Sequence, residues 1–86
     1  MTVVPRGAVL DQQVVELVAK QLYLPAGEIQ SEQTFAELGL DSILAVELTA
    51  DIKTTYGVQL QAADIYEHTT PQAFARLIER QLDAKA

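Results

Sequence analysis

The chain has 86 residues, of which 12 are acidic and 6 are basic, so its formal net charge is −6. It has no cysteine, which excludes disulfides, thiolate metal sites and thiol catalysis by the chain itself. Its acidity disfavours nucleic acid and anionic membranes as partners, and no apolar run approaches the ~20 residues that span a bilayer. We therefore expect one cytoplasmic domain over residues 1–86, with a core over about 8–83 and flexible ends at Met1–Gly7 and Asp83–Ala86.

The first predicted element is an amphipathic helix over Val9–Leu22. Apolar residues recur there at spacings of three and four, and polar residues lie between them. Pro25 and Gly27 are expected to end the helix. The predicted core face consists of Leu10, Val14, Leu17, Val18 and Leu22.

Residues 25–41 form a connection that is longer than is usual between helices. Thr34 and Glu37 have the spacing of a capping box, which predicts a short helical turn with Phe35 and Leu38 facing inward. A long connection with structure of its own is more often functional than a simple turn.

A second helix is predicted over Ser42–Tyr56, ended by Gly57. Ile43, Leu44 and Val46 point in different directions around its first turns, so they cannot all be buried. They either form a contact surface or are ordinary exposed apolar side chains, which need no explanation. The expected buried stripe is Ala45, Leu48, Ile52 and Tyr56.

Two further helices follow a connector at residues 58–60. A short one over Ala62–Glu67 is expected to offer Ile65 and Tyr66 to the core. Thr70 and Pro71 have the sequence of a helix start, so the last helix runs from there to about Leu82. Its predicted inner residues are Phe74, Leu77, Ile78 and Leu82, and its predicted outer residues are Gln72, Arg76, Glu79 and Arg80. The pattern indicates an all-α fold: a small bundle of three main helices plus a short third helix, with a long structured loop between helices one and two.

The negative charge is concentrated in the middle of the chain. Residues 28–67 hold eight acidic residues and one basic residue, Lys53, a net charge of −7. This segment either confers solubility or presents an acidic surface to basic partners. The sequence leaves both interpretations open.

Residues that could support catalysis are scarce. His68 is the only histidine, and a Ser42–His68–Asp41 hydrolase would lack an obvious cleft or oxyanion hole. The chain has two serines, Ser31 and Ser42, and Ser42 follows a glycine turn at a helix start. Asp41 or Ser42 could simply be the N-cap, yet a helix N-terminus also tolerates a phosphate on Ser42.

The run Gly39-Leu40-Asp41-Ser42-Ile43 resembles the attachment motif of acyl carrier proteins, in which the serine opens the second helix. The resemblance covers nearly the whole chain. It includes the first helix and the segments 34–39, 46–48, 56–58 and 69–71. Leu40 resembles the polyketide synthase carriers, since fatty acid carriers tend to have Ala there. Peptidyl carriers of nonribosomal synthetases usually lack the acid at Asp41.

The resemblance implies a non-catalytic carrier. Ser42 would receive 4′-phosphopantetheine from coenzyme A through a separate phosphopantetheinyl transferase, for which Asp41 helps to position the site. The arm would carry acyl intermediates as thioesters. Ketosynthase, acyltransferase and other synthase domains would contact helix two at Ile43, Val46, Glu47 and Asp51. The isolated domain is expected to be a monomer that binds neither nucleic acid nor membrane.

Other functions stay open at this point. The chain could be an acidic helical interaction module without a covalent arm, or a carrier from fatty acid or nonribosomal peptide synthesis. Carriers that host β-branching resemble this pattern but often have Trp six residues after the serine, where this chain has Leu48. Leu48 thus argues mildly for a non-branching carrier, although core packing also explains it. The sequence does not identify the acyl chain or the module.

Overall fold

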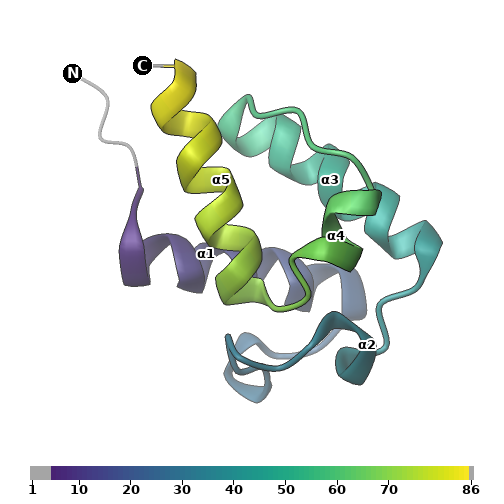
Figure 1. Ribbon diagram of the computed structural model, residues 1–86. Coiled ribbons are helices and arrows are strands. Elements are labelled where there is room, and N and C mark those ends of the chain that lie inside the picture. Colours follow the sequence, from purple (N-terminus) through teal and green to yellow (C-terminus); the bar gives the residue numbers. More distant parts are fainter. Residues whose placement is uncertain (1–4, 86) are drawn as a thin grey trace.

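The computed structural model describes residues 5–85, and every regular element within that range is a helix (Figure 1). The prediction of an all-α fold is confirmed. Three of the helices are long, and short helical segments lie in the connections between them. The elements are α1 (Gly7–Leu22), the 3₁₀ turn η1 (Ala26–Glu28), α2 (Phe35–Leu38), α3 (Ser42–Tyr56), α4 (Ala63–Glu67) and α5 (Pro71–Lys85). None of the helices in this range is long and apolar enough to cross a membrane.

Helix α1 ends at Leu22, as predicted, but its start and the way in which it is terminated differ from the prediction. It begins at Gly7 rather than Val9, and Val9 is exposed. Its C-cap is Tyr23, which adopts a left-handed conformation, so the helix stops before Pro25 and Gly27 are reached. The backbone N–H groups of Tyr23 and Leu24 donate to the carbonyls of Lys20 and Ala19, the paired bonds of a Schellman motif. The helix end is therefore set by backbone capping, with no Pro or Gly involved.

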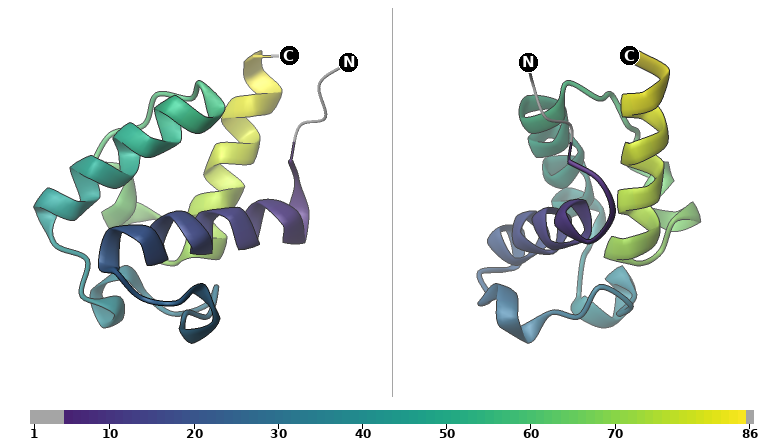
Figure 2. Two further views of the ribbon diagram at one scale, coloured as in Figure 1. Left: turned by 180° about the vertical axis from the view of Figure 1, so that it is seen from behind. Right: turned by 90° about the vertical axis from the view of Figure 1, so that its left-hand side faces the viewer.

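The core lies between α1, α3 and α5, with α1 packed against the other two helices. Figure 2 shows α5 crossing α1 and α3 rising beside them, so the apolar stripes of the three helices meet. The predicted stripe of α3 is confirmed at Ala45, Leu48 and Ile52, and Tyr56 is half-buried. In α1, Val15 and Ala19 are buried, whereas Leu17 and Leu22 lie at the edge of the core.

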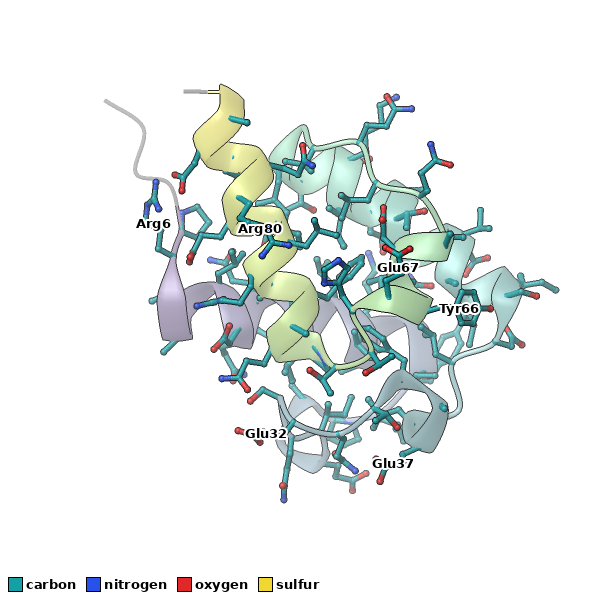
Figure 3. All side chains as sticks on the ribbon, viewed as in Figure 1. Arg6, Glu32, Glu37, Tyr66, Glu67 and Arg80 are labelled. Atoms are coloured by element: carbon teal, nitrogen blue, oxygen red, sulfur yellow. The ribbon has the colours of Figure 1, made fainter. Side chains whose placement is uncertain are left out.

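The prediction for Tyr66 is wrong. Ile65 is buried, but Tyr66 is 65% exposed and lies on the outer side of α4 (Figure 3). Adjacent helical residues point about 100° apart, since a turn holds 3.6 residues. A helix as short as α4 therefore buries one of the two side chains and leaves the other outside.

Contacts with the start of α5 hold the long connection in place. Its capping box is present, because Thr34 Oγ1 accepts from the Glu37 N–H and the Glu37 carboxylate accepts from the Thr34 N–H. The Phe35 N–H donates to the Thr69 carbonyl at 2.7 Å. The Phe35 ring meets that of Phe74 edge to face at 5.7 Å, with both side chains buried. These contacts fix the loop that leads to α3.

The two ends of the described chain are tied together by charged groups. Arg6 pairs with Asp83, and the Gly7 N–H donates to the Glu79 carboxylate at 2.9 Å. Arg76, expected on the outside, is half-buried and pairs with Asp11 at 2.5 Å. Of the ends predicted to be flexible, Gly7 lies in α1 and Asp83 lies in α5, while residues 1–4 and 86 lie outside the described range.

Candidate functional site at the start of helix α3

The site begins where α2 ends and the chain turns into α3. Gly39 has φ 87°, the left-handed conformation that glycine adopts without steric cost, and it stops α2 after Leu38. Leu40 then packs against the core, and Asp41 is extended, with φ −99° and ψ −178°. This path brings Asp41 and Ser42 to the surface at the first residues of α3.

Asp41 is the N-cap of α3. Its Oδ1 accepts from the Leu44 N–H at 2.8 Å, and its carbonyl accepts from the Ala45 N–H at 2.9 Å. This settles which of the two residues caps the helix. Ser42 is the first helical residue, is exposed, and its hydroxyl makes no hydrogen bond with any residue in the described range.

The surroundings of Ser42 fit a phosphodiester on its hydroxyl. The first backbone N–H groups of a helix have no intrahelical acceptor, and the helix N-terminus carries partial positive charge. The Asp41 side chain accepts from one of these groups, that of Leu44, and leaves the N–H groups of Ser42 and Ile43 without an intrahelical partner. A phosphate joined to Ser42 would therefore be stabilised by the end of α3 without any change of backbone.

An apolar pocket of about 260 Å³ lies beside this serine, between α2, α4 and the start of α3. Ala45 and Ile65 contribute to its floor, and Asp41 and the exposed Tyr66 are part of its lining. Figure 3 shows Tyr66 projecting from the outer side of α4. The sequence did not reveal this pocket, because its walls come from three segments that only the tertiary fold brings together. The full lining is Thr34, Phe35, Ala36, Leu40, Asp41, Ala45, Ile65, Tyr66 and Thr69.

The surplus apolar residues of α3 lie on its surface. Ile43 is 69% exposed and Val46 is 57% exposed, whereas Leu44 is half-buried. Glu47 is exposed next to Val46. The structure thus places three of the four predicted partner residues (Ile43, Val46 and Glu47) together on the solvent side of α3, within two turns of Ser42.

Asp51, the fourth predicted partner residue, has a different environment. Its carboxylate accepts a hydrogen bond of 2.5 Å from the Gln21 side-chain amide of α1, and the residue is partly buried. Asp51 therefore joins α3 to α1, while Glu47, one turn earlier, has no side-chain hydrogen bond within the described range. This contact lies between helices distant in sequence, and no local pattern indicates it.

Within residues 5–85, the Ser42 hydroxyl is not hydrogen-bonded to a histidine or a carboxylate. His68 caps the end of α4, its N–H donating to the Asp64 carbonyl at 2.9 Å, and it makes no hydrogen bond to Ser42. Among residues 5–85, no three His, Asp or Glu side chains are grouped so that they could hold a metal ion. Ser42 is thus an exposed hydroxyl to which no side-chain base of the described residues is hydrogen-bonded, and this suits modification by another enzyme.

Comparison with known proteins connects this arrangement to a family. A family model described as the phosphopantetheine attachment site matches residues 12–78. A large phenolphthiocerol/phthiocerol polyketide synthase polypeptide of Mycobacterium tuberculosis is 27% identical over 73 residues, which is 85% of this chain and 4% of that protein. The chain thus spans a small fraction of this curated relative.

Solved structures share the fold. A free-standing peptidyl carrier protein from Acinetobacter baumannii aligns with a TM-score of 0.82 and 27% identity over 87% of this chain and 94% of that chain. The HMG-ACPI domain from the CurA module of Lyngbya majuscula aligns with a TM-score of 0.80 and 27% identity over 100% of this chain and 93% of that chain. With the family model covering most of the sequence, the chain belongs to the phosphopantetheine attachment family, whose members are non-catalytic carriers of that prosthetic group.

Proposed function

We propose that this chain is an acyl carrier domain of a polyketide synthase, and that Ser42 carries the 4′-phosphopantetheine arm. The observation that carries the proposal is the division of roles at the start of α3. Asp41 caps the helix, so the exposed Ser42 hydroxyl is free to become a phosphodiester without loss of a structural bond. The thiol at the end of the arm would hold the acyl group, which is how a chain without cysteine performs thioester chemistry.

The transfer of the arm needs little from the chain itself. The Ser42 oxygen attacks the β-phosphate of coenzyme A, the new P–O bond replaces the bond to the 3′,5′-adenosine bisphosphate, and the serine proton leaves to a base of the transferase. The transferase and its Mg²⁺ supply the activation. This agrees with the absence of a side-chain base bonded to Ser42 among the described residues. Asp41 would keep the helix start in one conformation for the transferase.

The polyketide assignment rests on sequence more than on fold. The likeness to a mycobacterial polyketide synthase and the residues Leu40 and Asp41 favour it. A peptidyl carrier protein and an acyl carrier domain both have this fold, and each is 27% identical to this chain in sequence. The fold therefore does not discriminate between the two classes of carrier. Fatty acid and peptidyl synthesis are the alternatives within the family.

The proposed partners are a phosphopantetheinyl transferase and the ketosynthase, acyltransferase and other domains of the synthase. Exposed Ile43, Val46 and Glu47 would meet an apolar surface bordered by Arg or Lys, because Glu47 adds negative charge beside the two apolar side chains. The contacts are small, so each partner can release the carrier after transfer. The carrier would act as a cytoplasmic monomer when separated from other domains.

The test is intact-mass spectrometry after incubation with coenzyme A, Mg²⁺ and a broad-specificity phosphopantetheinyl transferase. We expect a gain of one phosphopantetheinyl group in the wild-type protein and in Ser31→Ala, and none in Ser42→Ala. Circular dichroism would establish that all three proteins are folded. A folded wild-type protein that gains no mass would reject the covalent arm and leave the acidic interaction module as the function.

A further inference from the structure

Tyr23 ends helix α1 in a conformation that its side chain disfavours. It has φ 56° and ψ 40°, and it is the one non-glycine residue with positive φ among residues 5–85. The left-handed region brings Cβ close to the following carbonyl oxygen, so residues with a side chain are strained there. The residue is also 94% exposed, so burial of its side chain does not offset the strain.

Glycine occupies the same position at the ends of two other helices in this chain. Gly39 follows α2 with φ 87°, and Gly57 follows α3 with φ 70°. Gly39 and Leu40 make the same pair of capping bonds as Tyr23 and Leu24, to the residues three and five positions earlier. Folding alone would therefore favour glycine at position 23, and an exposed aromatic ring at a strained position points to a role outside folding.

The last turn of α1 contacts α3 through Gln21 and Asp51. The two helices run antiparallel, since Gln13 bonds to Tyr56 at 2.6 Å and Gln21 bonds to Asp51 at 2.5 Å. Beyond Gln21 the chain continues toward the start of α3, which Figure 2 shows from behind the molecule. Tyr23 follows Gln21 by two residues, about 3 Å along the helix axis, and Glu47 precedes Asp51 by one turn.

We propose that Tyr23, with the partly exposed Leu24, is a second anchor of the carrier on the synthase domain that accepts its acyl group. This inference rests on the proposed function. We expect the partner of this anchor to be a surface with an apolar pocket bordered by Arg or Lys, because α1 continues from the Gln21–Asp51 contact toward the start of α3, where Val46 and the acidic Glu47 are exposed. A tyrosine contributes much contact area with few rotatable bonds, which suits a brief but specific contact.

The experiment replaces Tyr23 with glycine in the phosphopantetheinylated, acylated protein. Acyl transfer is measured over a range of carrier concentrations to a panel of purified polyketide ketosynthase–acyltransferase domain pairs. We expect KM to rise about fivefold to tenfold with kcat unchanged, as for loss of a binding anchor. The melting temperature is expected to stay at or above that of the wild type, because glycine suits the left-handed position.

Two controls separate the ring from other effects. Tyr23→Phe keeps the ring and should retain most of the wild-type KM, while Val9→Ala removes an exposed apolar side chain at the other end of α1 and should change nothing. An unchanged KM in Tyr23→Gly, or a lowered melting temperature, would overturn the inference while the mass gain at Ser42 upheld the proposed function. A loaded wild-type carrier that no member of the panel accepts would overturn the partner class. Absence of loading would reject the proposed function itself.

Discussion

The division of roles between Asp41 and Ser42 makes a prediction about stability. Asp41 accepts the capping bond from Leu44 at 2.8 Å, whereas the exposed Ser42 hydroxyl bonds to nothing in the described chain. Replacing Asp41 with alanine should therefore destabilise the protein, and replacing Ser42 with alanine should not. Asp41→Asn is the matched control, because asparagine caps helices about as well as aspartate but carries no charge.

The expected size of the effect follows from the lost cap. Removing an N-cap side chain costs about 1 kcal/mol, within a range of roughly 0.5–2 kcal/mol. For a domain of this size, 1 kcal/mol lowers the melting temperature by about 4–8 °C. Asp41→Ala should show that decrease, while Ser42→Ala and Asp41→Asn should stay within about 0.5 kcal/mol of the wild type.

The assay is urea unfolding at pH 7 followed by circular dichroism, with thermal melts in parallel. An equal loss of stability in Ser42→Ala and Asp41→Ala would contradict this assignment, because Ser42 would then have a structural role. Loading rates with the transferase add a second readout. If Asp41→Asn folds normally but accepts the arm slowly, then the charge of Asp41 serves the transferase separately from the cap.

Three further predictions concern the rest of the molecule. Glu47→Ala should leave the free energy of unfolding unchanged but slow acyl transfer to partners. Asp51→Ala should lower the free energy of unfolding in urea by about 1 kcal/mol, because it leaves the Gln21 amide without its hydrogen-bond acceptor. Equal stability of the two variants would contradict this. Phe74→Ala should destabilise by about 3–5 kcal/mol, since the ring is fully buried against Phe35, and a loss below 1 kcal/mol would contradict the packing. Burial, with a smaller effect from Glu16, raises the pKa of Tyr56 above its ordinary value of 10.0. As the pH rises, Tyr56 therefore ionises in the unfolded chain before it ionises in the folded protein. The contribution of the neutral Tyr56 to the free energy of unfolding is complete below pH 10 and falls as the pH rises through the pKa of the folded state. Melting temperatures from pH 8 upward should show this alkaline decline in the wild type and less of it in Tyr56→Phe, and equal declines would contradict the assignment.

Local patterns were sufficient to predict most of the helices and the position of Ser42. Signals that depend only on neighbouring residues are all present in the structure. They are the capping box at Thr34 and Glu37, the helix start at Thr70 and Pro71, and the helix ends at Gly39 and Gly57. The predicted last residue of α1, Leu22, is correct, but the helix is terminated by Tyr23 and not by Pro25 and Gly27, because the propensity of tyrosine gives no signal for a left-handed conformation.

Contacts between distant segments account for what the sequence could not reveal. The orientation of Asp51 depends on Gln21, thirty residues away, and the pocket beside Ser42 depends on where α4 packs. Tyr66 shows the same limit. The sequence pattern predicts that both Ile65 and Tyr66 contact the core. The placement of α4 decides that Ile65 is buried, whereas Tyr66 is exposed and lines the pocket beside Ser42.

The most direct test of the central claim is to locate the attached group within the chain. After loading with coenzyme A and transferase, a protease that cleaves after glutamate would release Ser42 in residues 38–47 and Ser31 in residues 29–32. Fragmentation of these peptides in a mass spectrometer identifies the modified residue. We expect one phosphopantetheinyl group, on Ser42, with the Ser31 peptide unmodified. A group on Ser31 or on any other residue, with Ser42 unmodified, would contradict it.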